Sequence, residues 1–235
     1  MPRTAWRGCA ATGIVAFICS SSFGRIPGMV ACGPDGGLGP IIAFEFARTP
    51  ADVAALFGSG PCTATLVAAQ KTGLLLDALG FIPFYTAFLI LGAIAANVRN
   101  RICMATIAAV IVAGVSDQIE GGLLYAILRD LPGTPTLIGL LWWAVHVKFF
   151  LLALATMWIG FLVAGKSWPR RLLAVVIGFG GLQAAARLIT TQPALMMVFF
   201  TMAWVSLLIA ALIASFSSLF EARAALPRDR ATPSA

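Results

Sequence analysis

Residues 113–122 read AGVSDQIEGG and place two carboxylates, Asp117 and Glu120, inside the apolar segment from Ile102 to Leu128. Residues three apart share one face of a helix. A carboxylate in a lipid-embedded helix is costly, and such residues nearly always face the protein interior and have a partner there. We therefore interpret residues 102–128 as a transmembrane helix, and we expect the partners of Asp117 and Glu120 to lie on other helices.

The composition of the whole chain is that of a membrane protein. Apolar residues make up 60% of the 235 residues and charged residues only 11%, whereas soluble domains carry about 25% charged residues. At about 20 residues per crossing, this length suits an all-α bundle of about six spans with no separate soluble domain. The net charge of +7 does not indicate a nucleic-acid partner, because the basic residues lie at the ends of apolar runs. Membrane lipids are the expected surroundings.

The apolar runs predict one transmembrane domain over residues 1–220. The first run, from Gly8 to Phe23, follows Arg3 and Arg7 and resembles a signal peptide, but no small-residue cleavage site follows it. We interpret it as an uncleaved first span. The second span is expected to begin near Thr72 and to end near Val98, with Pro83 kinking it. The remaining spans are 102–128, 136–164, 172–189 and 194–219, and residues 221–235 form a polar, disordered, cytoplasmic tail.

The distribution of Lys and Arg predicts the orientation. One set of span ends carries ten basic residues: Arg3, Arg7, Arg99, Arg101, Lys166, Arg170, Arg171, Arg223, Arg228 and Arg230. The other set carries four: Arg25, Arg48, Lys71 and Arg129. Because basic residues accumulate on the cytoplasmic side, we predict that both termini are cytoplasmic, in the inner (plasma) membrane of a bacterium.

Residues 24–63 form the one long connection, which this orientation places outside the cell. Thr49, Pro50 and Asp52 have the order of a helix N-cap, a first-turn proline and a first-turn acid, so a short helix over 50–57 should follow. The preceding segment, 40–47, contains Glu45 and is apolar enough to lie in the interface or dip into the protein. Cys32 and Cys62 both lie in this connection. They form either a disulfide or two unrelated thiols.

Ionisable residues also lie inside other spans: Asp77, Lys148 and Arg187. Counted from the cytoplasmic ends at about 1.5 Å per residue, Asp117 and Arg187 lie roughly 24 Å deep, Lys148 roughly 27 Å and Asp77 roughly 33 Å. These similar depths predict a charged cluster in the outer half of the bundle, with Lys148 and Arg187 as partners of Asp117 and Glu120.

Polar neighbours complete the predicted binding site. Gln183 lies four residues before Arg187, Tyr85 eight after Asp77, and His146 follows Trp142 and Trp143. Three acids against two basic residues leave one carboxylate in excess, and an unpaired buried acid is a natural proton carrier. The alternative is that Lys71 balances it. A structural network that only fixes helix register is the alternative.

The absent motifs narrow the chemistry. The single His and the lack of CxxC argue against a zinc site, and no GxSxG, P-loop or nucleotide fingerprint occurs. We therefore expect no cofactor and no metal. The site would bind or translocate a small substrate, a proton or a lipid, and an enzymatic role is less favoured. A membrane-embedded enzyme acting on a lipid-like substrate and a structural subunit of a larger complex remain the alternatives.

Several short motifs resemble the layout of certain uncharacterised bacterial polytopic membrane proteins. They are residues 45–50 (EFARTP), Leu76-Asp77 with residues 82–85 (IPFY), residues 117–120 (DQIE) and Lys148. The resemblance covers roughly residues 40–164 and brings no known activity. The resemblance implies only that the acids and Lys148 belong to one common arrangement of residues.

Overall fold

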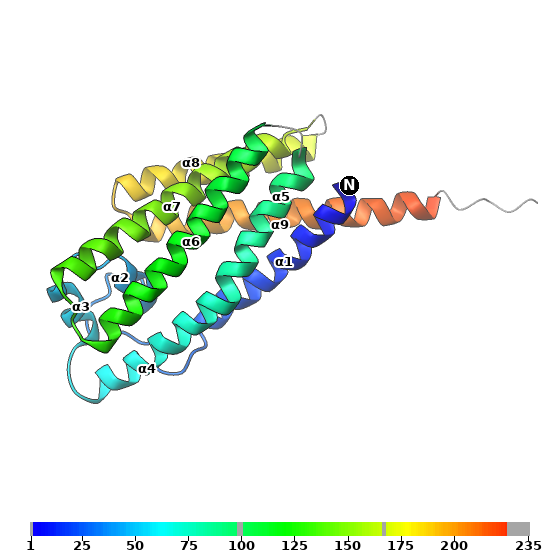
Figure 1. Ribbon diagram of the computed structural model, residues 1–235. Coiled ribbons are helices and arrows are strands. Elements are labelled where there is room, and N and C mark those ends of the chain that lie inside the picture. Colours follow the sequence, from blue (N-terminus) through cyan, green and yellow to red (C-terminus); the bar gives the residue numbers. More distant parts are fainter. Residues whose placement is uncertain (1, 98–100, 166–167, 225–235) are drawn as a thin grey trace, which may run out of the picture.

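Long helices account for most of the chain in the computed structural model (Figure 1), which describes residues 2–97, 101–165 and 168–224. The described part contains no strand. Its long helices are α1 (Pro2–Phe23), α4 (Pro61–Leu76), α5 (Ile82–Asn97), α6 (Arg101–Arg129), α7 (Pro135–Val163), α8 (Trp168–Ile189) and α9 (Pro193–Ala224). Two short helices, α2 (Pro40–Glu45) and α3 (Pro50–Phe57), lie in the connection between α1 and α4.

The long helices pack as a closed ring in which α1 contacts α5, α5 contacts α6, and so on through α7, α8 and α9 back to α1. Five segments are long and apolar enough to cross a membrane: Pro61–Ala96, Arg101–Arg129, Pro135–Val163, Trp168–Ile189 and Pro193–Phe216. The protein is therefore an all-helical integral membrane protein. Helix α1 belongs to the same ring but is not among these five, so its crossing remains a prediction. The start of α1 and the end of α9 lie at the same end of the bundle (Figure 1).

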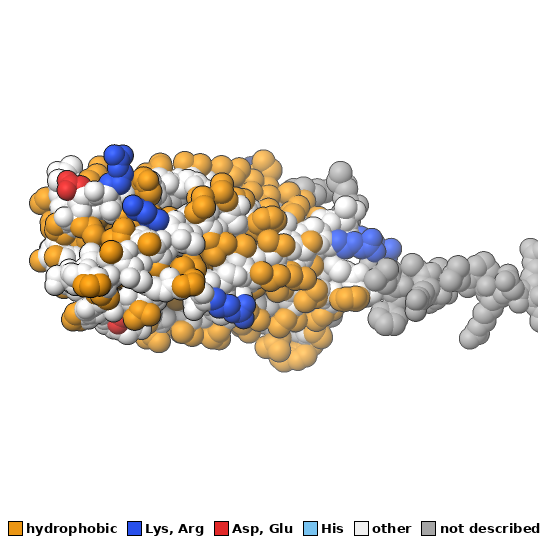
Figure 2. All heavy atoms as spheres, turned by 90° about the horizontal axis from the view of Figure 1, so that it is seen from below, with side chains coloured by type: hydrophobic (Ala, Val, Ile, Leu, Met, Phe, Trp, Pro, Cys, Tyr) orange, Lys and Arg blue, Asp and Glu red, His pale blue; other side chains and the backbone are white. Residues whose placement is uncertain are grey.

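The outer surface of the bundle is apolar. Figure 2 shows one face covered largely by apolar side chains, with only a few charged ones. On α6 the exposed residues include Ile111, Val115 and Ile119, the last of which is 56% exposed although it lies between Asp117 and Glu120. An exposed apolar surface of this extent is explained by lipid contact.

The second predicted span is continuous but contains a π-helical turn, Asp77–Phe81, between α4 and α5. Pro83 explains the irregularity, because proline has no backbone N–H and crowds the preceding turn. Within the turn, the N–H of Ile82 donates to the carbonyl of Asp77. The carbonyl of Ala78 instead accepts a hydrogen bond of 2.9 Å from the side chain of Gln118 on α6. The disturbance expected at Pro83 is thus a widened helical turn, and Asp77 is the first residue of this turn.

Glycines allow α7 and α8 to pack with their backbones in contact. A Cβ atom on Gly160 would overlap the backbone of Gly178, and one on Gly181 would overlap the backbone of Met157. Small residues of this kind are typical of close helix packing in membranes. They hold α8 against the side of α7 that faces away from α6.

The connection between α1 and α4 folds back onto the bundle. Cys32 and Cys62 form a disulfide that ties it to the start of α4. Helix α3 begins at Pro50 and ends at Phe57, at the predicted residues, and Thr49 and Asp52 form a capping box at its start. Phe44 of α2 packs edge-on against Phe57, with ring centroids 5.0 Å apart, and both are buried.

At the other end of the chain, α9 continues to Ala224, so its last turn overlaps the start of the predicted tail. Residues 225–235 of that tail lie outside the described part. So do Arg99, Lys166, Arg228 and Arg230, four of the ten basic residues on which the predicted orientation rests.

Candidate functional site

Lys148 lies at the centre of the charged cluster. Its ammonium nitrogen, Nζ, is 3.1 Å from Oδ1 of Asp117, 2.8 Å from Oε1 of Glu120 and 3.3 Å from Oε2 of Glu45. Oε2 of Glu120 is also within 2.7 Å. All four residues are buried. An ammonium group has three N–H donors, so these three carboxylates occupy the hydrogen-bonding capacity of Lys148.

Helices α6 and α7 supply three of the four members. Asp117 and Glu120 lie on one face of α6, as their spacing predicts, and Lys148 lies on the face of α7 that meets them. Ser116 donates to the carbonyl of Ala144 at 2.9 Å, which holds the two helices together beside the cluster. Tyr85 of α5, fully buried, donates its hydroxyl to Oδ2 of Asp117 at 2.8 Å.

Glu45 comes from the short helix α2 rather than from a long helix. Phe46, next in the chain, stacks on Phe149 with ring centroids 5.7 Å apart, and Gln70 of α4 donates to the carbonyl of Pro40 at 2.9 Å. These contacts hold α2 against the bundle and direct Glu45 towards Lys148. Burial raises the pKa of the Glu45 carboxyl, and the Lys148 ammonium acts in the opposite direction.

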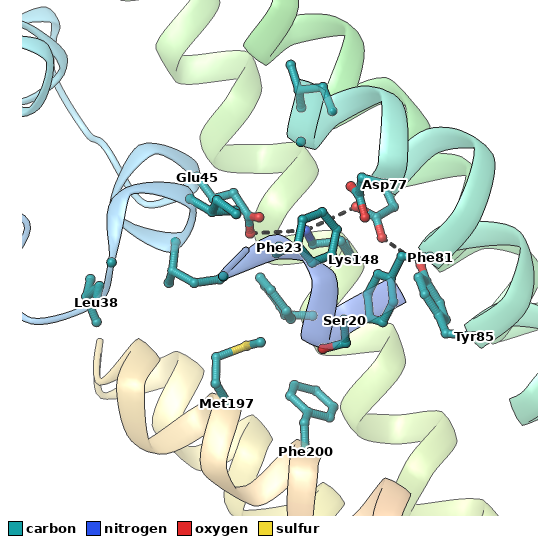
Figure 3. A pocket seen from close by; sticks show the side chains of 18 of the residues that line it. Ser20, Phe23, Leu38, Glu45, Asp77, Phe81, Tyr85, Lys148, Met197 and Phe200 are labelled. Atoms are coloured by element: carbon teal, nitrogen blue, oxygen red, sulfur yellow. Dashed lines mark hydrogen bonds and ion pairs between the residues drawn. The ribbon is translucent and has the colours of Figure 1, made fainter. Parts of the chain in front are cut away.

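A cavity of about 390 Å³ lies against the cluster. Its charged lining residues are Glu45, Asp77, Asp117 and Lys148; Glu120 does not line it. In Figure 3, Glu45 and Asp77 lie on either side of Lys148, Phe23 is drawn level with Lys148, and Met197 and Phe200 lie below. The volume of this cavity is typical of a small-molecule site. Its lining is typical as well, because it is mostly apolar with a few converging polar groups.

Three lining residues are exposed, so the cavity reaches the protein surface. They are Ser20 on α1, Gly24 just after it, and Thr201 on α9. Helices α1 and α9 pack together further along, where the Cβ position of Gly13 is close to Leu208. The opening therefore lies between these two helices, at the end of the bundle that carries the α1–α4 connection (Figure 1).

Asp77 is the least satisfied member of the site. It is half-buried and lines the cavity, and its side chain makes no hydrogen bond or ion pair with any residue that the structure describes. Its position in the π-helical turn follows from Pro83. A carboxylate that faces a cavity without a protein partner is available to a ligand.

The predicted partnership of Arg187 with Asp117 and Glu120 is wrong. Arg187 bonds instead to Oε1 of Gln192 at 2.9 Å, in the turn that follows α8. Within the described ranges, no residue of α8 lines the cavity, so Gln183 also lies away from it. The reason is the packing: α8 contacts α7 and α9 but lies on the far side of α7 from α6.

His146 lies near the cluster without joining it. Its Nδ1 is 2.7 Å from the carbonyl of Trp142, and its ring stacks on the Trp142 ring with centroids 3.9 Å apart. The ring also meets Phe46 edge-on at 6.1 Å. These contacts account for His146 as a packing residue beside α2.

The residue that sequence reasoning missed is Glu45. The signal was present, since Glu45 is an acid within the apolar run 41–46, the same feature that identified Asp117. With Glu45 included and Arg187 removed, the balance changes from three acids and two bases to four acids and one base. No group of His, Cys, Asp and Glu among the described residues is arranged to hold a metal ion.

No protein-family profile, curated protein or solved structure matches this chain.

Proposed function

We propose that this integral membrane protein binds a small, membrane-soluble ligand in the cavity beside Lys148, and that the ligand reaches the cavity from the bilayer between α1 and α9. The observation that carries the proposal is the cavity itself, about 390 Å³ in volume, with charged groups on one wall and apolar groups on the others. A satisfied structural network needs no such space, because side chains in protein interiors are close-packed.

The route from the bilayer follows from the position of the opening. Thr201 lies eight residues into α9, within the apolar segment Pro193–Phe216, and Ser20 lies on the last turn of α1. At about 1.5 Å per residue, Thr201 is roughly 12 Å from the start of α9. This depth is within the hydrocarbon layer, so the opening faces acyl chains rather than water. The binding step serves either the transport of a small substrate or the handling of a lipid.

The proposal includes the predicted membrane topology. With α1 as a sixth crossing and the basic ends in the cytoplasm, the α1–α4 connection and the cavity lie at the outer side of a bacterial inner membrane. The disulfide between Cys32 and Cys62 supports a periplasmic position for this connection, because disulfides persist in the oxidising periplasm and are rare in the cytoplasm.

Binding can be tested with eight-carbon probes in nanodiscs of zwitterionic phosphatidylcholine. Isothermal titration with 1-octanol and with octylammonium should show saturable binding beyond the signal of empty nanodiscs. Thr201→Trp, which places a bulky ring at the opening, should weaken binding at least about tenfold, equivalent to about 1.4 kcal/mol. Val198→Trp is the matched control, because Val198 is exposed on the same helix but does not line the cavity.

The structural alternative gives a different pattern. If the charges only fix helix packing, neither probe binds saturably, Thr201→Trp and Val198→Trp behave alike, and cluster variants change thermal stability alone. That set of results would overturn the proposed function.

A further inference from the structure

The ionisable side chains that face the cavity are predominantly acidic. Glu45, Asp77 and Asp117 line it together with one basic residue, Lys148, and Glu120 lies behind Lys148 as a fourth acid. A buried charge without a counter-ion is strongly disfavoured. Four carboxylates around one ammonium therefore require protons, a further cation, or both.

The basic residue of this wall is not available to an anionic ligand. Lys148 already contacts three carboxylates and lies 4.4 Å from the centroid of the Phe149 ring. Two other donors of the lining are also engaged: Tyr85 donates to Asp117, and Trp204 donates to Oγ1 of Thr156 at 3.1 Å. Asp77, by contrast, offers two acceptor oxygens with no partner among the described residues. The wall thus accepts hydrogen bonds and positive charge.

The aromatic side chains of the lining form a continuous arc. Phe23 meets Phe81 at 5.9 Å between ring centroids, Phe81 meets Tyr85 at 5.2 Å, and Tyr85 meets Trp204 at 5.5 Å. The arc continues from Trp204 to Phe200 at 5.8 Å and from Phe200 to Phe149 at 5.9 Å. Aromatic rings attract cations and bury large apolar areas, so this arc offers a surface for the hydrocarbon part of a cationic ligand.

We propose that the cavity selects an alkylammonium ion, with its positively charged head against Asp77 and Glu45 and its hydrocarbon part along the aromatic arc. This inference rests on the proposed function, because it names the ligand class of the same cavity. An anion of the same size is excluded by the acids. A neutral alcohol gains the apolar contacts but not the charge.

Three probes with one chain length and different heads test the selection: octylammonium, 1-octanol and octanoate. Titrated into nanodiscs at pH 7, octylammonium should bind at least about tenfold more tightly than 1-octanol, and octanoate should bind most weakly. Asp77→Asn should weaken the binding of octylammonium by a similar factor and leave that of 1-octanol unchanged, whereas Asp77→Glu should retain the preference. Asp130→Asn, an exposed acid at the end of α6, is the control.

The outcomes separate the two proposals. Equal binding of the three probes, or tightest binding of octanoate, overturns the alkylammonium assignment and leaves the binding site standing. Loss of the head-group preference in Asp130→Asn as well as in Asp77→Asn also overturns it, since the effect then reflects surface charge. No saturable binding of any probe overturns the proposed function itself. If octylammonium fails while proton uptake by the purified protein depends on Asp77, protons alone balance the cluster and the assignment is wrong.

Discussion

Lys148 is the residue on which three separate elements depend, because its ammonium group contacts acids from α2 and α6 and its backbone belongs to α7. The ion pairs differ from surface salt bridges, since all four side chains are buried. Removing one partner from a buried pair leaves an uncompensated charge, which typically costs about 3–5 kcal/mol. The ammonium therefore stabilises the bundle as well as the wall of the cavity.

Replacing Lys148 with Met should lower the free energy of unfolding by about 3–5 kcal/mol. Scanning fluorimetry of the tryptophans in detergent would measure the corresponding fall in melting temperature. Adding Glu45→Gln, Asp117→Asn and Glu120→Gln to the same chain should restore part of the loss, because no unpaired carboxylate then remains. Lys71→Met is the control, since Lys71 is exposed and lies 5.9 Å from the Tyr125 ring centroid. A quadruple variant less stable than Lys148→Met would contradict this account.

At the residue scale, depth counting predicted some partners and not others. It brought Lys148 to the level of Asp117, and the two are in contact. It placed Arg187 at the same level, yet Arg187 bonds to Gln192. Counting along a helix gives height in the membrane but not the direction in which a side chain points around the helix axis. Glu45 was missed for a related reason: it lies on a connection, to which no crossing depth can be assigned.

Among the elements, α3 was the most predictable because its signals are local. Oγ1 of Thr49 accepts from the backbone N–H of Asp52 at 3.2 Å, and Oδ2 of Asp52 accepts from the N–H groups of Arg48 and Thr49 at 2.9 Å each. The π-helical turn at Asp77 was only partly predictable. Pro83 indicated a disturbance, but its form depends on Gln118 of another helix, which supplies a donor for the carbonyl of Ala78.

The capping box gives the connection a pH dependence. The backbone hydrogen bond from Arg48 is the main cause that lowers the pKa of Asp52 below its usual value. Because the folded-state pKa is lower than the unfolded one, the stabilisation is complete above the unfolded pKa and is lost as the pH falls through the folded pKa. Asp52→Ala should destabilise α3 by roughly 0.3–1 kcal/mol at pH 7, with a smaller difference at acid pH.

Hydrogen exchange of the amides of residues 50–57 would measure this effect. Ser59→Ala, at an exposed position just after α3, should leave the exchange unchanged. Faster exchange in Asp52→Ala that persists equally at low pH would show that the side chain acts through packing rather than through its charge.

At the scale of the whole molecule, hydropathy predicted the all-helical membrane bundle well, because each long helix must satisfy its own backbone in lipid. The neighbours of each helix were not predictable in the same way. The ring order, with α9 returning to α1, brings the first and last helices together and leaves the opening between them. Such contacts join residues about 195 positions apart, as Gly13 and Leu208 show, and neither periodicity nor charge along the chain encodes them.

The ring also makes the topology testable on the intact chain. Because α1 begins where α9 ends, both termini should lie on one side, and the basic residues predict the cytoplasm. Green fluorescent protein that is exported unfolded through the bacterial secretion pathway does not become fluorescent. Fusions at residue 1 and at residue 235 should therefore both fluoresce. A bright C-terminal fusion with a dark N-terminal fusion would mean that α1 does not cross and that the bundle has five spans. Two dark fusions would place the connection and the cavity on the cytoplasmic side, where the disulfide between Cys32 and Cys62 would not be expected to persist.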